Sequence, residues 1–122
     1  MTITGSFTAS GNVTAYSDKL IKNKIRPISQ AVSKLKQING YQYKNLLANK
    51  YDCGIIAQEI EKILPELVEV GTTEYNSTKL KTVNYNGVVA LLVAANRELI
   101  ARIEALEKQV HASTLVRAHK PR

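Results

Sequence analysis

The sequence is poor in the residues that most often build catalytic and metal sites. Cys53 is the only cysteine among 122 residues, which excludes an intrachain disulfide and a cysteine-rich metal centre. The two histidines, His111 and His119, both lie near the C-terminus, so no histidine-based catalytic centre is expected in the body of the chain. With no histidine near it, Cys53 is predicted to be a small buried residue rather than a nucleophile. We therefore expect no metal and no cofactor.

A long hydrophobic run is also missing. The longest strongly apolar run, Val88 to Ala95, is far too short to span a bilayer. The Thr-, Ser- and Gly-rich N-terminus has no basic segment before an apolar one, so no signal peptide and no membrane partner are expected. Apolar residues make up 44% and charged residues 22% of the chain, which is ordinary globular composition and argues against wholesale disorder. This length predicts one modest domain with an extended arm.

Charge is absent from residues 1–16 and unevenly spread after them. Residues 17–50 hold eight basic residues and one acidic residue, a net +7, whereas residues 51–110 hold six basic and nine acidic residues, a net −3. Three more basic residues in 111–122, which we predict to be a basic tail, bring the total to 17 − 10 = +7. Such asymmetry suits a nucleic-acid surface, or two parts of a fold or two chains that attract each other.

A nucleic-acid partner is the weaker of these interpretations. Its basic surface would run from Lys19 to Lys50, but apart from Tyr41, Tyr43 and Tyr51 little aromatic surface interleaves with it. No RRM, KH or zinc-finger motif is present either. We therefore expect no nucleic acid as a partner, and no small-molecule substrate is legible.

The uncharged segment 1–16 has the pattern of a strand. From Ile3 to Ala15 the odd positions are apolar or small, and the even positions are Thr, Ser or Asn. This two-residue alternation is typical of a strand with one buried face. No second strand of the same character follows, and a lone strand is not stable. The expected partner is another copy of the chain; the alternative is a flexible leader.

Helical and strand patterns alternate in the middle of the chain. A helix is predicted from Pro27, with a stripe that ends at Ile38, before a stop at Asn39-Gly40. A second helix is predicted over Ala57–Leu64, because Pro65 cannot continue it. Strands are expected to start at Tyr41–Tyr43 and to cover Leu67–Val70 and Leu80–Tyr85, with a loop at Asn45–Asp52 and a turn region at Gly71–Thr78. These patterns predict an α+β fold: a small mixed domain of short strands or hairpins and two shorter helices, followed by a long C-terminal coiled-coil helix.

A heptad pattern runs along the final helix. Its a positions are Val89, Asn96, Ile103 and Val110, and its d positions are Tyr85, Leu92, Leu99 and Leu106. This 4-3 spacing is the seam of a coiled coil, with Arg102 and Glu107 placed for an interchain ion pair. In the first half the flanking positions are apolar as well, so that half is expected to pack on the body and on partners. The alternative is an amphipathic helix of a monomer.

The heptad pattern alone does not determine how many chains assemble. β-branched residues at a, Leu at d and the buried Asn96 favour a two-stranded coil. The helix is short and attached to other elements, however, so the arm can impose a different number. Asn96 is equally suited to meet a residue of the body or a water.

One pair of residues with catalytic chemistry lies where the arm meets the domain. Ser17 and Lys22 are five residues apart. A serine hydroxyl needs a base, and a neutral lysine can supply one in a Ser-Lys variant of the serine-protease design. The site would have to bury Lys22 or crowd it with positive charge, which Lys19, Lys24 and Arg26 can provide. The spacing alone is weak evidence, because Ser17 and Asp18 also suit a turn or a helix cap.

Three motifs resemble a known family. The segment Ser17 to Lys22 after a Thr/Gly-rich arm resembles the start of the intramolecular chaperone domain of phage tail fibres and tailspikes, the endosialidase-type, self-cleaving peptidase S74 family. Gly54 to Ile60, followed by Leu64 to Val68, is similar to its second motif. Val83-Asn84-Tyr85 and a Leu-rich helix containing Arg97-Glu98-Leu99 are similar to its third. The match covers about Ser17 to Val110, in three motifs of matching order and spacing.

The resemblance implies a homotrimer that helps an upstream β-stem of the same chain to fold and then cuts itself off. Residues 1–16 would be the end of the stem, 17–110 the chaperone and auto-cleavage domain, and 111–122 the tail. Ser17 would attack the carbonyl of Tyr16, and Lys22 would act as base and then as acid, with Asp18 and Glu59 as candidate supporting residues. The coiled-coil contacts would come from Leu92, Asn96, Leu99, Ile103, Leu106 and Val110. The fibre would belong to the virion after assembly in the host cytoplasm, and the released domain could be lost from it. A fibre domain that trimerises without cleavage remains an alternative.

Overall fold

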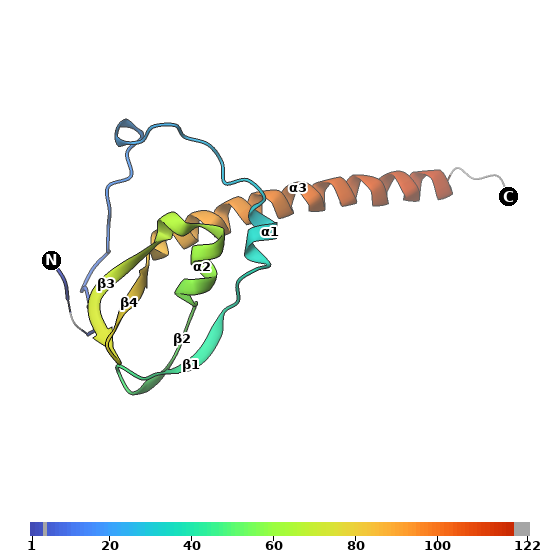
Figure 1. The fold of residues 1–122 in the computed structure, drawn as a ribbon. Coiled ribbons are helices and arrows are strands. Elements are labelled where there is room, and N and C mark those ends of the chain that lie inside the picture. The colour runs from blue at the N-terminus through green and yellow to red at the C-terminus, as the bar shows by residue number, and fades with distance from the viewer. Residues whose placement is uncertain (4, 119–122) are drawn as a thin grey trace.

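The computed structural model describes residues 1–3 and 5–118 of the chain. The elements are two 3-10 turns, three α-helices and four strands. In chain order these are η1 (Lys19–Ile21), α1 (Ala31–Leu35), β1 (Tyr41–Asn45), β2 (Lys50–Gly54), α2 (Ala57–Ile63), η2 (Pro65–Leu67), β3 (Val68–Tyr75), β4 (Thr78–Val83) and α3 (Tyr85–Ala118). Figure 1 shows a small body of hairpins and short helices from which α3 projects as a long rod. The α+β class with a long C-terminal helix is thus confirmed.

The strands form two separate antiparallel hairpins. β1 pairs with β2 from Tyr41 opposite Gly54 to Asn45 opposite Lys50. β3 pairs with β4, and its register shifts between Val70 and Glu74. Each two-stranded sheet covers only a small area, so the faces of these hairpins depend on the helices for burial.

The core lies where α1 and α2 pack with the first half of α3. Ile60 of α2 and Leu91 of α3 are its largest fully buried side chains. Around them the cluster contains Ala31, Val32, Ile63, Leu64 and Ala95. Such a small core supports only a modest stability, because burial of apolar area is the main favourable contribution to folding.

The start of α3 is fixed to η2 by a close approach. A Cβ on Gly87 would lie 2.0 Å from Leu67 Cδ2, so any larger residue there must displace the Leu67 side chain. The backbone amide of Asn84 donates to the carbonyl of Leu67 at 2.8 Å. The Asn84 side chain then caps the helix, because its Oδ1 accepts from the amides of Asn86 (3.1 Å) and Gly87 (3.4 Å). This first turn is therefore rigidly placed against the body.

The loop and turn boundaries differ from those expected. The predicted loop 45–52 is shorter, because β1 extends through Asn45 and β2 begins at Lys50. The predicted turn region 71–78 contains only the two-residue turn Asn76-Ser77, whose positive φ values of 51° and 63° suit a tight hairpin. Gly71 lies inside β3, at the register shift. Tyr85 begins α3 rather than ending a strand.

The first helix is shorter than the predicted helix from Pro27. α1 covers only Ala31–Leu35, since Gln30 adopts a left-handed conformation with φ 51°. A carboxylate from another element caps it: Glu98 of α3 accepts from the amides of Ala31 (2.7 Å) and Val32 (3.0 Å). These two bonds, the one from Val32 first, hold the pKa of Glu98 below its ordinary value.

The segment before α1 lies outside the core. Residues 1–3 and 5–16, called the arm below, contain no strand and are exposed in the single chain. Residues 17–30, called the strap below, arch from the arm to α1 (Figure 1). Leu20, Ile21 and Ile25 of the strap are exposed apolar residues. The pairing of the arm with other copies stays a prediction.

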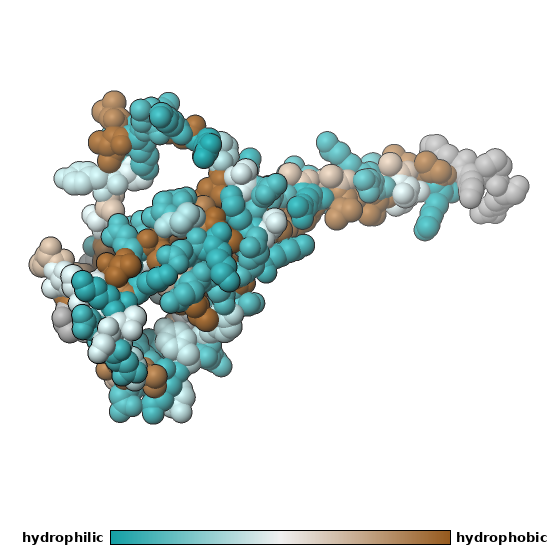
Figure 2. Space-filling view, in the orientation of Figure 1, coloured by the Kyte–Doolittle hydropathy of each residue, from teal (hydrophilic) through white to brown (hydrophobic). Residues whose placement is uncertain are grey.

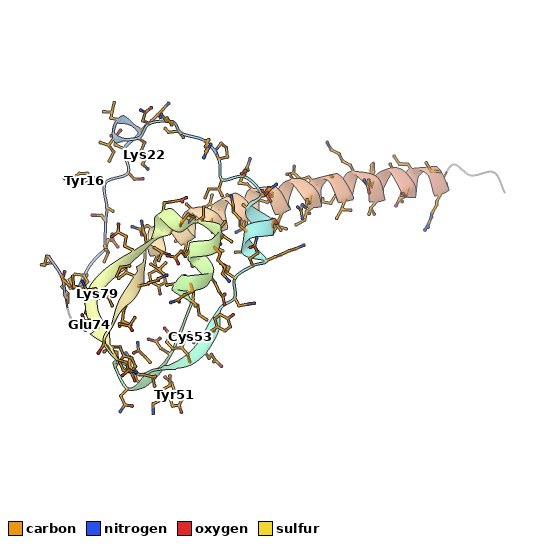
Figure 3. All side chains as sticks on the ribbon, in the orientation of Figure 1. Tyr16, Lys22, Tyr51, Cys53, Glu74 and Lys79 are labelled. Carbon is orange, nitrogen blue, oxygen red and sulfur yellow. The ribbon has the colours of Figure 1, made fainter. Side chains whose placement is uncertain are left out.

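Cys53 is exposed, so its predicted burial is wrong. It lies on β2, where Lys50 to Cys53 are all exposed. Figure 3 places Cys53 near the hairpins, far from Tyr16 and Lys22. No helix within residues 1–3 and 5–118 has the length and apolarity needed to cross a membrane.

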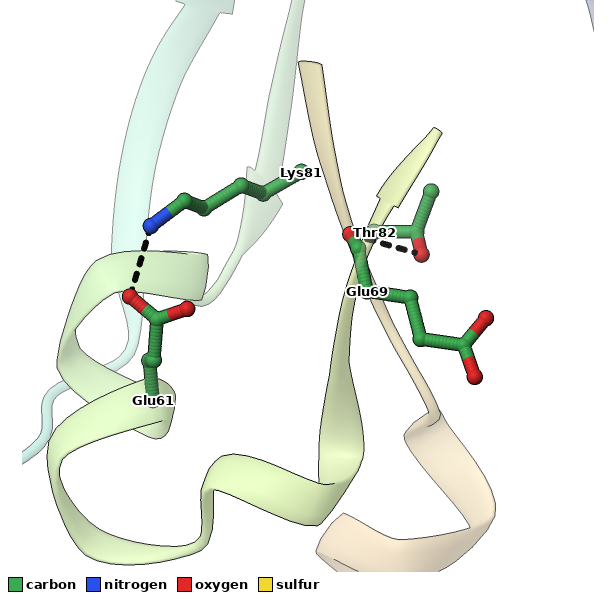
Figure 4. A network of polar contacts seen from close by, with 4 residues as sticks. All are labelled: Glu61, Glu69, Lys81 and Thr82. Carbon is green, nitrogen blue, oxygen red and sulfur yellow. Dashed lines mark hydrogen bonds and ion pairs between the residues drawn. The ribbon is translucent and has the colours of Figure 1, made fainter. Parts of the chain in front are cut away.

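Polar contacts tie the hairpins to the helices (Figure 4). Lys81 of β4 forms an ion pair with Glu61 of α2, with Nζ and Oε1 2.6 Å apart. On the β3–β4 hairpin, the hydroxyl of Thr82 donates to the carbonyl of Glu69 at 3.3 Å. The ion pair is partly exposed, so it orients α2 over the hairpin more than it stabilises the fold.

Candidate functional site

Ser17 and Lys22 come together at the beginning of the strap. The side-chain amine Nζ of Lys22 donates to Ser17 Oγ at 2.6 Å. The turn η1 makes this contact possible, because it folds the five-residue interval back on itself: the amide of Lys22 donates to the carbonyl of Lys19 at 3.0 Å. The structure thus provides the contact between hydroxyl and amine that a Ser-Lys pair requires.

Asp18 serves as the cap of this turn. Its Oδ1 accepts from the amide of Leu20 at 2.9 Å, and its carbonyl accepts from the amide of Ile21 at 3.2 Å. No hydrogen bond joins Asp18 to Lys22 in the described part of the chain. Asp18 therefore shapes the backbone between Ser17 and Lys22 and does not orient the amine directly.

A cavity of about 550 Å³ lies beside the Tyr16–Ser17 bond. Val13–Ser17 and Lys22 form one wall, and the first turns of α3 form the other. The α3 side is made of Asn84, Asn86, Gly87 and Ala90. Figure 3 shows Tyr16 and Lys22 near each other at the strap, and the side chain of Tyr16 is 97% exposed. The bond predicted to break is therefore open to attack and lies next to a rigid element.

Both members of the pair are exposed in the single chain. For the transfer of a proton from Ser17 to Lys22, the amine must first be neutral, and burial is what favours the neutral form of a lysine. The pair has the right geometry in this chain, whereas the burial must come from something that covers it.

Glu59 lies elsewhere. From α2 its carboxylate accepts from the Tyr41 hydroxyl at 2.6 Å and from the Asn39 amide at 3.2 Å. The bond to Glu59 raises the pKa of Tyr41. Glu59 does not line the cavity beside the Tyr16–Ser17 bond. Its hydrogen bonds instead connect α2 to β1, which is a structural role.

The heptad residues of α3 form an exposed stripe. Leu92 is 42% exposed, and from there on the exposure of the apolar residues of the stripe ranges from 38% at Leu99 to 65% at Val110. Figure 2 shows hydrophobic side chains on the projecting rod, which no other part of the chain covers. The Asn96 side-chain nitrogen donates to the carbonyl of Leu92 at 2.8 Å, one turn earlier in the same helix. Leu99, Ile103 and Leu106 belong to the same stripe.

The predicted basic tail begins inside this helix, because α3 continues through Ala118. Residues 119–122, which include His119, lie outside the described residues. Within the described ranges, no three His, Cys, Asp or Glu side chains are arranged to hold a metal ion.

Sequence reasoning missed the α3 wall of the cavity beside the Tyr16–Ser17 bond. Asn86 carries no distinctive spacing relative to Ser17 and Lys22. Asn84 falls in the third motif and has the residue type of a helix cap, which was the available signal. Neither feature indicates proximity to Tyr16, since that depends on the packing of the arm.

Much of this chain is similar in sequence to known proteins. Residues 17–69 match the family described as chaperone of endosialidase, Peptidase_S74. The long tail fiber protein Gp37 of Enterobacteria phage K3 is 34% identical over 104 residues, which are 81% of this chain. Gp37 of Salmonella phage S16 is 36% identical over 103 residues, 77% of this chain. The aligned region is 8% of the first relative and 13% of the second, so this chain spans a small part of their length.

A solved structure is also similar. It is described as the crystal structure of a novel intramolecular chaperon, with 24% identity and a TM-score of 0.49. The alignment covers 67% of this chain and 97% of that one. The resemblance predicted from the three motifs is confirmed: residues 17–69 carry the signature of the chaperone of endosialidase family.

Proposed function

We propose that this chain is a trimerising intramolecular chaperone of a phage tail fibre, which assists the folding of an upstream β-stem and releases itself by cleavage at Tyr16–Ser17. The family match at residues 17–69 and the tail fibre relatives support the chaperone role. The observation that carries the cleavage is the 2.6 Å contact between Lys22 Nζ and Ser17 Oγ, directly after Tyr16. The domain boundaries follow: stem end 1–16, chaperone domain 17–110 and tail 111–122.

The chemistry is a single-turnover acyl transfer within the chain. Ser17 Oγ attacks the carbonyl carbon of Tyr16 while neutral Lys22 takes the hydroxyl proton. The C–N bond then breaks, and Lys22 returns the proton to the departing amine of Ser17. Water hydrolyses the resulting ester, which leaves a carboxylate on Tyr16 and a free N-terminus on Ser17.

Assembly supplies what the single chain lacks. The exposed stripe Leu92–Val110 of α3 gives three copies a common seam, with Asn96 inside it. Neighbouring copies that cover the exposed apolar residues of the strap would also dehydrate Lys22 and favour its neutral amine. Cleavage then follows assembly without a separate switch. Bringing three chain ends together also raises their effective concentration, which favours the slow, non-local winding of a β-stem.

The partners of the domain are therefore two more copies of the chain and the stem of its own chain. The proposal places the fibre in the virion, after assembly in the host cytoplasm, with the chaperone domain released from the fibre chain by the cut. The tail fibre names of its relatives support this location.

The cleavage is tested by intact mass. The wild-type chain should separate into residues 1–16 and 17–122, whereas Ser17→Ala and Lys22→Ala should each stay whole. Lys19→Ala, which removes a neighbouring cation outside the pair, should still be cut. Cleavage that continues in Ser17→Ala or Lys22→Ala would overturn the assignment of the pair.

The exposure of the pair supports one other candidate, a fibre domain that trimerises without cutting. An uncut wild-type chain that sediments as a trimer favours this candidate. A chain that stays monomeric at all concentrations contradicts both.

A further inference from the structure

A cleavage of this kind needs a group that stabilises the negative charge developing on the Tyr16 carbonyl oxygen. Removing such a donor commonly costs a serine hydrolase about 100- to 1000-fold in rate. The cavity beside the Tyr16–Ser17 bond holds the scissile residues on one wall, so the donor is to be sought on the opposite wall, at the start of α3.

The backbone amides of that wall already have partners. Those of Asn86 and Gly87 donate to the Asn84 side chain, and the amide of Asn84 donates to the carbonyl of Leu67. The usual backbone source of an oxyanion hole is therefore occupied at these three positions.

Among the side chains, two carboxamides lie on this wall, because Gly87 and Ala90 have no polar side chain. The orientation of the Asn84 carboxamide is fixed by its Oδ1, which caps α3, whereas no such bond in the described part of the chain restrains that of Asn86. Thr14 also lines the cavity, but it belongs to the arm, which the reaction detaches. The Asn86 side chain is exposed and makes no hydrogen bond within the described residues.

We propose that the Nδ2 group of Asn86 donates a hydrogen bond to the oxyanion formed at Tyr16. This inference rests on the proposed cleavage. As Ser17 Oγ bonds to the carbonyl carbon and its proton moves to Lys22, the carbonyl π electrons move onto oxygen, where the Asn86 amide stabilises them. When the electrons return, the C–N bond breaks and the proton passes from Lys22 to the amine of Ser17.

The position of Asn86 at the fixed start of α3 suits this role, because a donor stabilises a developing charge best when it is already in place. Asn86 follows the cap residue Asn84 and precedes Gly87, which the contact with Leu67 fixes against η2. The donor is thus on the rigid body, while the bond that it serves is on the exposed arm.

The experiment follows the cleavage rate of the full chain after synthesis, by gel and mass. Asn86→Ala should slow cleavage about 100- to 1000-fold. Its melting temperature, its sedimentation and the midpoint of its pH–rate profile should match wild type, because Lys22 is untouched. Gln58→Ala is the matched control: it removes an exposed carboxamide of α2 that does not line this cavity, and it should be cut at nearly the wild-type rate.

Three results overturn the inference. One is wild-type cleavage in Asn86→Ala, and the second is a slow Asn86→Ala that has also lost folded stability or assembly. The third is an equal slowing in Gln58→Ala, which would mean that the loss is not specific to the wall of the cavity. In each of these the wild type still cuts itself, so the proposed function stands. A wild type that never cuts overturns both proposals.

Discussion

The two halves of α3 share an exposed heptad face, yet only the first half also has a buried face. Leu91 and Ala95, which are at neither a nor d positions, are 0% and 1% exposed and pack with α1 and α2. The heptad residue Leu92 is 42% exposed in the same half, and every residue from Leu99 to Arg117 is exposed in the second half. Between the halves, Glu98 still accepts hydrogen bonds from the start of α1. Periodicity thus determines which residues share a face, whereas the other elements of the chain determine which face of the helix is covered within one molecule.

The largest expected effect is at the covered half. Leu91→Ala removes a fully buried side chain from a small core, and should lower the free energy of unfolding by about 2–5 kcal/mol. Urea unfolding followed by circular dichroism of the dilute chain measures it. Leu106→Ala, at an exposed position of the same helix, should change that free energy by less than about 0.5 kcal/mol.

The contrast between the two halves fails if Leu91→Ala and Leu106→Ala lower the free energy of unfolding by the same amount. An equal loss at Leu106 in the dilute monomer would mean that the distal half packs on the body. By sedimentation equilibrium the proposed trimer should weaken with Leu106→Ala, because the distal stripe is its seam.

A smaller effect is expected where the covered half begins. Gly87→Ala places a Cβ 2.0 Å from Leu67 Cδ2, so the contact between α3 and η2 must open. Overpacking of this kind costs about 1–3 kcal/mol, more than the helix propensity of alanine returns. Thermal unfolding should show a lower melting temperature.

Leu67→Ala combined with Gly87→Ala provides the control. The double variant should recover part of the loss, since the shortened side chain makes room for the new methyl group. If the double variant loses as much as the sum of the two single variants, the contact is not the cause.

The smallest effect is at the boundary between the halves. Glu98 accepts two amide bonds from α1, and its pKa is lowered in the folded chain. A carboxyl with a lowered folded pKa stabilises the fold above its ordinary pKa of about 4.5 and loses that contribution as the pH falls. Glu98→Gln should therefore lower the melting temperature at pH 7 and reduce its decline from pH 7 to pH 3.

Glu104→Gln, on the exposed half of the helix, should leave the melting temperature at pH 7 close to wild type. If Glu98→Gln has the same pH dependence of melting as wild type, the carboxylate cap does not stabilise α1.

Local signals in the sequence predicted most of the helices and hairpins. Pro65 ends α2 as expected, and the heptad pattern predicts the stripe of α3 that stays exposed, although the helix continues beyond the pattern to Ala118. The two-residue turn at Asn76-Ser77 lies inside the predicted region, but β3 continues through Gly71 to Tyr75, with a register shift on the way. Strand ends are set by pairing across the hairpin, which residue type alone does not reveal.

Features that depend on distant residues could not be predicted. The cap of α1 comes from Glu98, more than sixty residues later. The sequence around Pro27 does not contain this signal, and it therefore predicts a longer helix than the structure has. The residue type of Cys53 predicts burial, but β2 is exposed from Lys50 to Cys53. The Ser17–Lys22 contact follows from a short local turn, whereas the Asn86 wall beside it follows from how the arm lies on α3.

The placement of the strap has a consequence for the lifetime of the folded body. All fully and nearly fully buried side chains belong to residues from Ala31 onward, and Ile28 is the first residue that packs against them. A break in the chain before Ile28 therefore removes no buried contact, and the two pieces differ from the intact chain mainly in chain entropy. In mechanical terms the strap connects the arm to the core. After a break in the chain before Ile28, force on the arm is no longer transmitted to the core, and the body keeps its own unfolding rate.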